Sequence, residues 1–271
     1  MSHFTVLGGG GFIGAALVRH LRDAGHEVDA PQRDDPGLIM RDLGHVVYCI
    51  GLTADFRSRP FDTVRAHVSV LTEVLAQGRF SSLLYLSSTR IYGKGGTGKE
   101  VADVPVNSAD PSDLYNLSKL MGESLCLNGG RQDVRVARLS NVVGMDHGSS
   151  NFLFDLIRDA KQGRILLRSA LESAKDYILL EDVLEMLEAI SLRGQGATIY
   201  NVASGHQLSH RQLCDQLAAL TGCSVAVADG APLLAFPEIC TARIREQFGF
   251  RPRDVLAALP HLVDESDHRT N

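Results

Sequence analysis

Tyr115 and Lys119 are the residues of this chain whose types and spacing most directly indicate chemistry. On a helix, positions four residues apart lie one turn apart on one face, so this spacing places a phenol beside an ammonium. A free tyrosine has a pKa of about 10, and a neighbouring positive charge lowers it. The pair could therefore exchange a proton with a substrate, although an exposed surface pair would show the same spacing.

A second group of polar side chains follows an apolar run. Residues 82–86 are expected to form a buried strand, and Ser87, Ser88 and Thr89 come directly after it, followed by Arg90. In open α/β sheets, ligands bind at the carboxyl ends of the strands. We therefore expect these hydroxyls to face a ligand site.

A glycine-rich turn near the start of the chain suggests what that ligand site holds. The spacing Gly8-x-x-Gly11-x-x-Gly14 lies between a short expected strand, residues 4–7, and a helical pattern that reaches Gly25. Glycines let the backbone approach a pyrophosphate closely, and a helix N-terminus offers free N–H groups and partial positive charge. A glycine turn without any ligand would have the same composition, but its strand-and-helix context favours a dinucleotide loop. The residues expected to contact the cofactor here are Gly8, Gly11, Phe12, Ile13 and Gly14.

The residues that would select between NAD and NADP give a mixed signal. An acidic residue after the second strand binds the free 2′-hydroxyl of NAD, whereas a nearby arginine accommodates the 2′-phosphate of NADP. After the expected strand at residues 27–30, Gln32 occupies the acidic position and Arg33 follows it, with Asp34 one residue later. Both cofactors stay open. Gly51 and Leu52 follow the apolar run 46–50 and are expected beside the cofactor.

Bulk properties restrict the class of protein. The chain has 271 residues with 44% hydrophobic residues, 22% charged residues and a net charge of −5, which fits one large domain or a domain with a small lobe. We expect neither a nucleic-acid surface, because no basic run is present, nor a membrane span, because no apolar run approaches about 20 residues. The histidines lack metal-site spacing, and the five scattered cysteines suggest reduced thiols in a cytoplasmic protein.

The remaining elements must position these groups. Only a short segment separates residue 30 from residue 45, so the usual third strand and its helix are expected to be abbreviated. A helix is expected at residues 63–77. On the helix that carries Tyr115, a stripe of Leu114, Leu117, Met121 and Leu125 is expected to pack in the core, leaving the stripe with Tyr115 and Lys119 to face a pocket.

Six motifs in order give the chain a family likeness. Together they resemble the extended short-chain dehydrogenase/reductase superfamily, in its nucleotide-sugar epimerase/dehydratase branch. The motifs are the glycine loop 8–14, residues 84–93 (LYLSSTRIYG), Tyr115-x-x-x-Lys119, residues 137–144 (ARLSNVVG), residues 175–183 (KDYILLEDV) and residues 200–205 (YNVASG).

The resemblance implies an architecture. The fold is expected to be α/β, a Rossmann-like doubly wound parallel sheet with a small C-terminal substrate-binding lobe. Residues 1–145, completed by about 176–204, would form the cofactor domain, and residues 146–175 and 205–271 the lobe. Family members often form homodimers through the helix that bears Tyr115, so a homodimer is expected.

The resemblance also implies roles. Tyr115 would be the catalytic acid or base, Lys119 its electrostatic partner and a ligand of the nicotinamide ribose, and Ser88 the hydroxyl that holds the reacting oxygen, with Thr89 as its fallback. Asn141 would contact the diphosphate of a nucleotide-sugar. Lys175 stands where the family usually has arginine and is a further substrate-binding candidate, as is Arg90.

Departures from the family pattern narrow the reaction. The family's dehydratases carry an Asp-Glu pair where this chain has Thr89 and Arg90, and arginine cannot serve as a general acid or base at neutral pH. His67 replaces a usual asparagine, and the region from Asn141 to Lys175 is short. The leading hypothesis is an NAD(P)-dependent nucleotide-sugar epimerase. The alternatives are an NADPH-dependent reductase of a keto sugar or related carbonyl and a non-catalytic cofactor-binding regulator.

Overall fold

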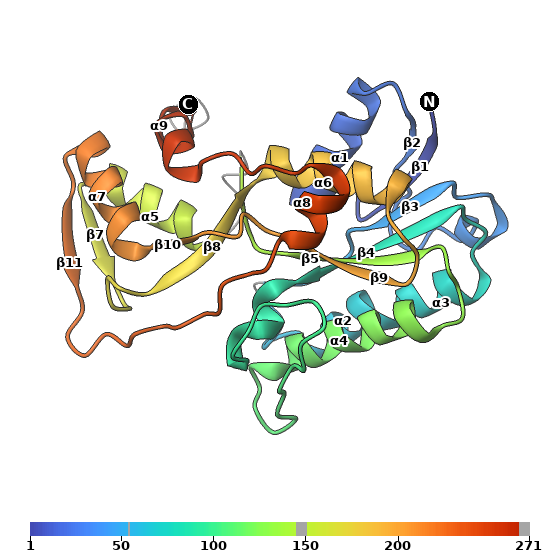
Figure 1. Ribbon diagram of the computed structural model, residues 1–271, viewed down its shortest axis with the longest axis horizontal. Helices are drawn as coiled ribbons and strands as arrows, with labels where there is room; N and C mark the ends of the chain where they lie inside the picture. Colours follow the sequence, from blue (N-terminus) through green and yellow to red (C-terminus); the bar gives the residue numbers. More distant parts are fainter. Residues whose placement is uncertain (54, 145–150, 266–271) are drawn as a thin grey trace.

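The structure, a computed structural model, describes residues 1–53, 55–144 and 151–265 and is built around a six-stranded parallel sheet (Figure 1). All five strand pairs of this sheet are parallel, and the strand order reverses direction between β1 and β3, as in doubly wound folds. The predicted fold class is thereby confirmed. In spatial order the strands are β2 (Glu27–Asp29), β1 (His3–Leu7), β3 (His45–Tyr48), β4 (Ser82–Ser88), β5 (Val134–Leu139) and β9 (Thr198–Val202).

Helices cover both faces of the sheet. On one face lie α1 (Phe12–Asp23), α6 (Leu180–Arg193) and α8 (Ala242–Phe248), above the sheet in Figure 1. On the other lie α2 (Pro60–Val64), η2 (Arg65–Ser69), α3 (Val70–Gln77) and α4 (Asp113–Asn128). The central strands are buried on both faces, which explains their near-continuous apolar sequences. Within the described part of the chain, no helix is both long and apolar enough to cross a membrane.

The expected abbreviation after the second strand is present. Only the short 3-10 turn η1 (Leu38–Met40) lies between β2 and β3, so β2 is an edge strand of the sheet. The loop before η1 is held by Asp35, which accepts a hydrogen bond from the backbone of Gly37 and forms an ion pair with Arg41. The connection from β2 to β3 is therefore a short polar loop rather than a further strand and helix.

The glycine turn follows β1 as the spacing predicts. Gly8 has φ of +85°, and a Cβ placed on Gly14 would lie 2.2 Å from the Gly8 carbonyl oxygen. Neither position accepts a larger residue without moving the backbone. The turn therefore brings the start of α1 directly against the end of β1.

The helix expected at residues 63–77 is continuous but not regular. Its middle, η2, is a π-turn, a feature that adds one residue to the helical turn and is frequent at functional sites. His67 lies within this turn and is fully buried. The sequence pattern predicts the helix but not this local widening.

The prediction that the apolar stripe of α4 packs in the core is wrong. Met121 is 55% exposed, and Leu114, Leu117 and Leu125 are only partly buried. The buried face of α4 is instead polar, with Tyr115, Asn116, Ser118, Lys119 and Glu123 packed against β4, β5 and η2. Helical periodicity separates two faces of a helix, but hydrophobicity alone misassigned which one lies on the sheet.

A smaller lobe lies beside the carboxyl ends of β4 and β5 (Figure 1). It contains the sheet β10 (Gln207–Ser209), β8 (Ala174–Leu179), β6 (Asn141–Val143) and the parallel pair β11 (Ser224–Val227) and β7 (Arg164–Leu167). Helices α5 (Phe152–Lys161), α7 (His210–Thr221) and α9 (Val255–Glu265) share an apolar core with these strands. The division of the chain into domains at residue 145 stays a prediction.

Candidate functional site

A cavity of about 1200 Å³ lies between the carboxyl ends of the sheet strands and the lobe. It is lined by the glycine turn, the ends of β4 and β5, the start of α4 and residues of the lobe. Most sequence-predicted site residues meet there, although they come from six separate parts of the chain. They are Gly11, Phe12, Ile13, Gly14, Gly51, Ser88, Thr89, Arg90, Tyr115, Lys119, Asn141 and Lys175.

Four predicted residues are not among those that line the cavity. Gly8 and Leu52 contact residues at or near the cavity instead. The Gly8 carbonyl accepts a hydrogen bond from Gly11, and the Leu52 amide donates to Nε2 of His67. Gln32 and Arg33 are exposed on the loop after β2. Their roles in cofactor selection stay a prediction.

Tyr115 is only 4% exposed and points into a polar corner of the cavity. Burial raises the pKa of its phenol, while hydrogen bonds with the side chains of Ser88 and Thr53 and the positive charge of Arg90 act in the opposite direction. The expected lowering by Lys119 is therefore not present in the protein alone. Desolvation of the phenolate exceeds the nearby charges in its effect on the pKa.

Lys119 lies one helical turn from Tyr115 and is 5% exposed. Its ammonium donates a hydrogen bond to the carbonyl of Leu86 at 2.8 Å and lies over the ring of Tyr85. Burial lowers its pKa to about 7, with attraction to Glu123 acting the other way. Since the Lys119 ammonium has no ion pair of its own in the described structure, it retains hydrogen-bonding capacity for a ligand.

His67 connects this corner to the loop after β3. Its Nε2 accepts from the Leu52 amide at 3.2 Å, so in the neutral ring Nδ1 carries the proton and donates to Ser118 Oγ at 2.8 Å. Ser118 in turn donates to the carbonyl of Tyr115. The His67 ring also meets the Tyr115 ring edge-on at 5.2 Å. Burial lowers the pKa of His67 to about 2, so the residue is a neutral support for Tyr115.

Arg90 occupies the other side of Tyr115. The 3-10 turn η3 (Thr89–Lys94) begins directly after β4, with Ser88 Oγ accepting from the Arg90 amide. The Arg90 guanidinium lies 5.3 Å from the Tyr115 ring centre and 4.9 Å from that of Phe56. Ser88, Tyr115 and Arg90 therefore surround one corner of the cavity.

The lobe closes the opposite side of the cavity. Lys175 of β8 lies over the rings of Phe152 and Phe236, and Asn141 donates to the carbonyl of Asp176. Phe236, Phe152, Phe56 and Thr53 were missed by the sequence reasoning as site residues. The motif that begins at Lys175 can be recognised in the sequence. Phe236, however, lies on an irregular segment, and no local sequence pattern predicts that this segment returns to the cavity.

The glycine turn fits the pyrophosphate of a dinucleotide. Gly11 to Gly14 line the cavity. Because Gly11 precedes α1 and has no side chain, it does not cap the first amides of this helix. A Cβ at Gly10 would meet no heavy atom within 4 Å, so the backbone here is open to a ligand. Free amides at the N-terminus of a 12-residue helix suit an anionic group. No cluster of potential metal ligands occurs among the described residues.

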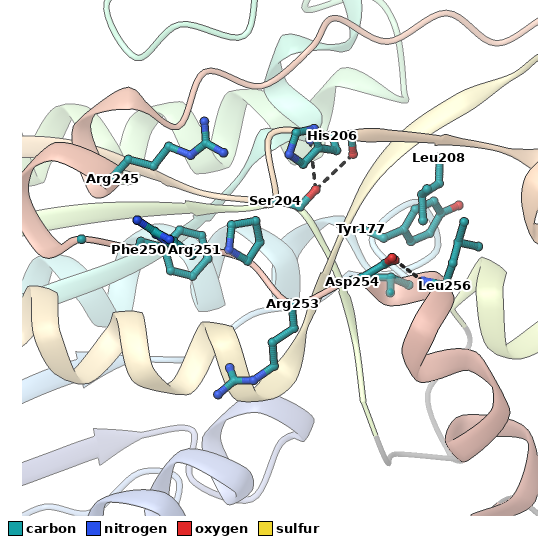
Figure 2. A pocket seen from close by; sticks show the side chains of 13 residues that line it. Tyr177, Ser204, His206, Leu208, Arg245, Phe250, Arg251, Arg253, Asp254 and Leu256 are labelled. Carbon is teal, nitrogen blue, oxygen red and sulfur yellow. Dashed lines mark hydrogen bonds between the residues drawn. The ribbon is translucent and has the colours of Figure 1, made fainter.

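A second cavity, of about 800 Å³, lies between β8, the segment after β9 and the chain that joins α8 to α9 (Figure 2). Arginine side chains and His206 surround it, and Figure 2 shows Ser204 bonded to the backbone of His206. None of the predicted catalytic or cofactor residues lines it. The larger cavity is therefore the candidate active site.

Comparison with known proteins agrees with this geometry. The profile of the NAD dependent epimerase/dehydratase family matches residues 4–203, which include both the glycine turn and the Tyr115–Lys119 pair. The chain belongs to this family. The family is NAD(P)-dependent, as expected from the glycine turn.

The chain is 28% identical to GDP-6-deoxy-D-mannose reductase of Pseudomonas aeruginosa over 79% of this chain and 78% of that protein. It is 24% identical to the spore coat polysaccharide biosynthesis protein SpsK of Bacillus subtilis, with 98% of both chains covered.

Solved structures show the same fold. RMD from P. aeruginosa complexed with NADPH superimposes with a TM-score of 0.79 at 24% identity, covering 99% of this chain and all of that one. MoeE5 in complex with UDP-glucose and NAD superimposes with a TM-score of 0.82 at 20% identity, again covering 99% of this chain and all of that one. The chain thus shares its fold with a protein complexed with NADPH and with one complexed with UDP-glucose and NAD.

Proposed function

We propose that this protein is an NAD(P)-dependent nucleotide-sugar epimerase. The observation that carries the proposal is the meeting of Ser88, Tyr115 and Lys119 in one cavity with the glycine turn. Thr89 and Arg90 stand beside Ser88, so the cavity lacks there the carboxyl groups that elimination of water would require. A reaction that only removes and returns a hydride needs no such pair.

In this proposal Ser88 and Tyr115 hold the oxygen of the reacting sugar carbon. Tyr115 accepts the hydroxyl proton when the carbon is oxidised and returns it when the carbon is reduced. Its buried phenol requires nearby positive charge to ionise near neutral pH, and Arg90 supplies some of it. When bound, the nicotinamide dinucleotide supplies the hydride acceptor and donor.

The remaining lining residues would bind rather than react. Gly11, Phe12, Ile13 and Gly14 would hold the pyrophosphate of the cofactor. Lys119 would bond the nicotinamide ribose, because its ammonium is buried with only one carbonyl partner. Asn141 and Lys175 would contact the diphosphate of the substrate on the lobe side of the cavity.

The test is turnover of a panel of UDP-, dTDP- and GDP-sugars, followed by chromatographic separation of C4 epimers. We expect interconversion of one pair, with no net change in cofactor absorbance at 340 nm. Tyr115→Phe should lower kcat by about 10²- to 10⁴-fold, because it removes general acid–base catalysis. Absence of epimers on the whole panel, with bound cofactor verified by mass spectrometry, would refute the proposal.

A reductase of a keto sugar is the second candidate, and two observations favour it. Gln32 and Arg33 carry no negative charge against a 2′-phosphate, and Asp34 beside them forms an exposed ion pair with Arg65. The relative from P. aeruginosa is itself described as a reductase. Stoichiometric loss of NADPH absorbance with product would select this candidate over the epimerase. Tyr115→Phe with unchanged activity on every substrate would favour a non-catalytic regulator.

We also propose that the enzyme is a cytoplasmic homodimer. Met121 on α4 and Phe61 on α2 are 55% and 89% exposed, and the two helices lie side by side. Apolar side chains on neighbouring helices suit contact with a second copy. The five unpaired cysteines are consistent with a reducing compartment. Sedimentation of the wild type against Met121→Lys tests the dimer.

A further inference from the structure

Arg90 is a half-buried cation without an anionic partner. Among the described residues, its guanidinium makes no hydrogen bond or ion pair, and it lies over the rings of Phe56 and Tyr115. Burial lowers the pKa of Arg90, with Arg57 acting in the same direction and Tyr115 and Asp113 in the opposite one, so the net effect is that an added negative charge would favour the guanidinium. Arg138, which is buried, is by contrast paired with Glu123.

The carboxylates around Arg90 are mostly committed elsewhere. Asp113 accepts hydrogen bonds from Lys94, from the Asn107 amide and from Asn116. Asp176 accepts from two backbone amides of the segment after β9. Asp55 also lines the cavity but is exposed to solvent. The guanidinium is therefore available to a ligand.

The position of Arg90 determines which part of a ligand it can reach. Its backbone amide is bonded to Ser88 and its guanidinium lies beside Tyr115, the two residues proposed to hold the reacting oxygen. Lys175 is near enough to Arg90 for their charges to repel, but it lies on the lobe side between two phenylalanine rings. Lys175 is thus placed for the diphosphate, and Arg90 for a substituent next to the reacting carbon.

We propose that Arg90 selects a nucleotide-linked uronic acid, whose carboxylate stands on the ring carbon next to the reacting one. This inference rests on the proposed function, because it takes Ser88 and Tyr115 as the groups that hold the reacting oxygen. A guanidinium is planar and can donate two parallel hydrogen bonds to a carboxylate, which a neutral hydroxymethyl group cannot accept in the same way. Arg90 would then determine specificity in addition to its electrostatic effect on Tyr115.

The test compares matched acidic and neutral ligands by calorimetry in the Tyr115→Phe background with NAD⁺ added, so that no turnover is needed. The probes are UDP-glucuronate with UDP-glucose, and GDP-mannuronate with GDP-mannose. We expect the acidic member of one pair to bind about 10- to 100-fold more tightly. Adding Arg90→Gln should abolish this preference, and Arg90→Lys should keep part of it. Arg59→Gln is the control, since Arg59 is exposed, lies outside the cavity and pairs with Asp62.

Three outcomes would overturn the inference: equal binding within both pairs, preference for the neutral member, or an acidic preference that survives Arg90→Gln. Its failure is distinguishable from failure of the proposed function. If the preference depends on Arg90 but the wild type forms no epimer or reduced product, the uronate inference stands and the proposed reaction falls. If a neutral sugar turns over and Arg90→Gln leaves its kcat/KM unchanged, the reaction stands and the inference falls.

Discussion

Helix α4 carries two buried polar clusters that differ in how their charges are satisfied. Glu123 and Arg138 form a two-bond ion pair at 3.0 and 2.6 Å, and Arg138 also donates to the hydroxyl of Tyr92, which donates to Asn201. Each charge in this cluster has a partner within the protein. One turn towards the N-terminus, Lys119 is equally buried but has only a carbonyl partner.

On one helix, the difference separates a structural ion pair, formed by Glu123, from the candidate catalytic residues Tyr115 and Lys119. Complete pairing satisfies the hydrogen bonds of Glu123 and Arg138 inside the protein and joins β5 to α4. At Lys119 and Tyr115, burial lowers the pKa of the ammonium and raises that of the phenol, and the charges nearby do not offset it, so a bound ligand can change both. The three predictions below test this contrast, from the largest expected effect to the smallest.

Removal of Glu123 should have the largest effect on stability. Glu123→Leu leaves Arg138 buried without its carboxylate and should lower the free energy of unfolding by about 3–5 kcal/mol. Urea denaturation followed by circular dichroism measures it. The double variant Glu123→Leu/Arg138→Met should recover most of the loss, because the remaining charge is also removed. A single variant that costs less than about 1 kcal/mol would show that the pair is not a structural requirement.

Removal of the charge on Lys119 should instead increase the stability of the folded protein. Lys119→Met replaces a buried cation without a carboxylate partner, so the free energy of unfolding should rise by about 1–4 kcal/mol while turnover falls. The folded pKa is about 7 and the unfolded pKa about 10.4. The unfolded chain therefore binds the extra proton between these values, and wild-type stability rises with pH across that window.

The gap between Lys119→Met and the wild type should accordingly be widest below pH 7 and close by about pH 10. Denaturation of both proteins at several pH values measures this gap. Lys119→Arg is the matched control that keeps a charge at the position. If Lys119→Met is less stable than the wild type at pH 7, then Lys119 contributes to the structure as Glu123 does.

His67 should produce a smaller, acid-dependent effect. Its pKa is about 2 in the folded protein against an ordinary value of 6.5, so the unfolded chain takes up the proton first as the pH falls. Its contribution should lower the free energy of unfolding by about 1.4 kcal/mol for each pH unit below 6.5. His67→Gln should flatten this slope, measured by thermal unfolding between pH 7.5 and 5. Equal slopes in both proteins would indicate that His67 is protonated when folded.

The sequence predicted which residues meet in the candidate cavity better than it predicted the electrostatics within that cavity. The Tyr115–Lys119 spacing, the glycine turn and the position of Ser88 after a strand rest on local geometry, and these residues do meet. The pairing of Glu123 with Arg138 was not predicted, because it joins a helix and a strand only through the tertiary fold. The same holds for Phe236, which reaches the cavity from an irregular segment.

The raised pKa of Tyr115 could not be read from spacing for a related reason. Proximity to Lys119 indicates attraction, whereas desolvation depends on every neighbouring element. The core stripe of α4 was assigned wrongly because polar residues were assumed to face away from the sheet. Here the sheet accepts them, since Leu86, Ser88 and Arg138 offer polar partners at the strand ends.

Gly122 sets how near α4 can come to β4. A single methyl group there would lie 2.5 Å from the Tyr85 hydroxyl and 3.0 Å from the backbone oxygen of His67. Tyr85 itself donates to that same His67 oxygen, so helix, strand and π-turn converge on this point. Because Gly122 has no side chain, α4 lies close to β4, and this close packing sets the distance between Tyr115 on the helix and Ser88 on the strand. A larger residue at position 122 would push α4 away from β4 and so separate the hydroxyls of Ser88 and Tyr115, although it would contact neither of them.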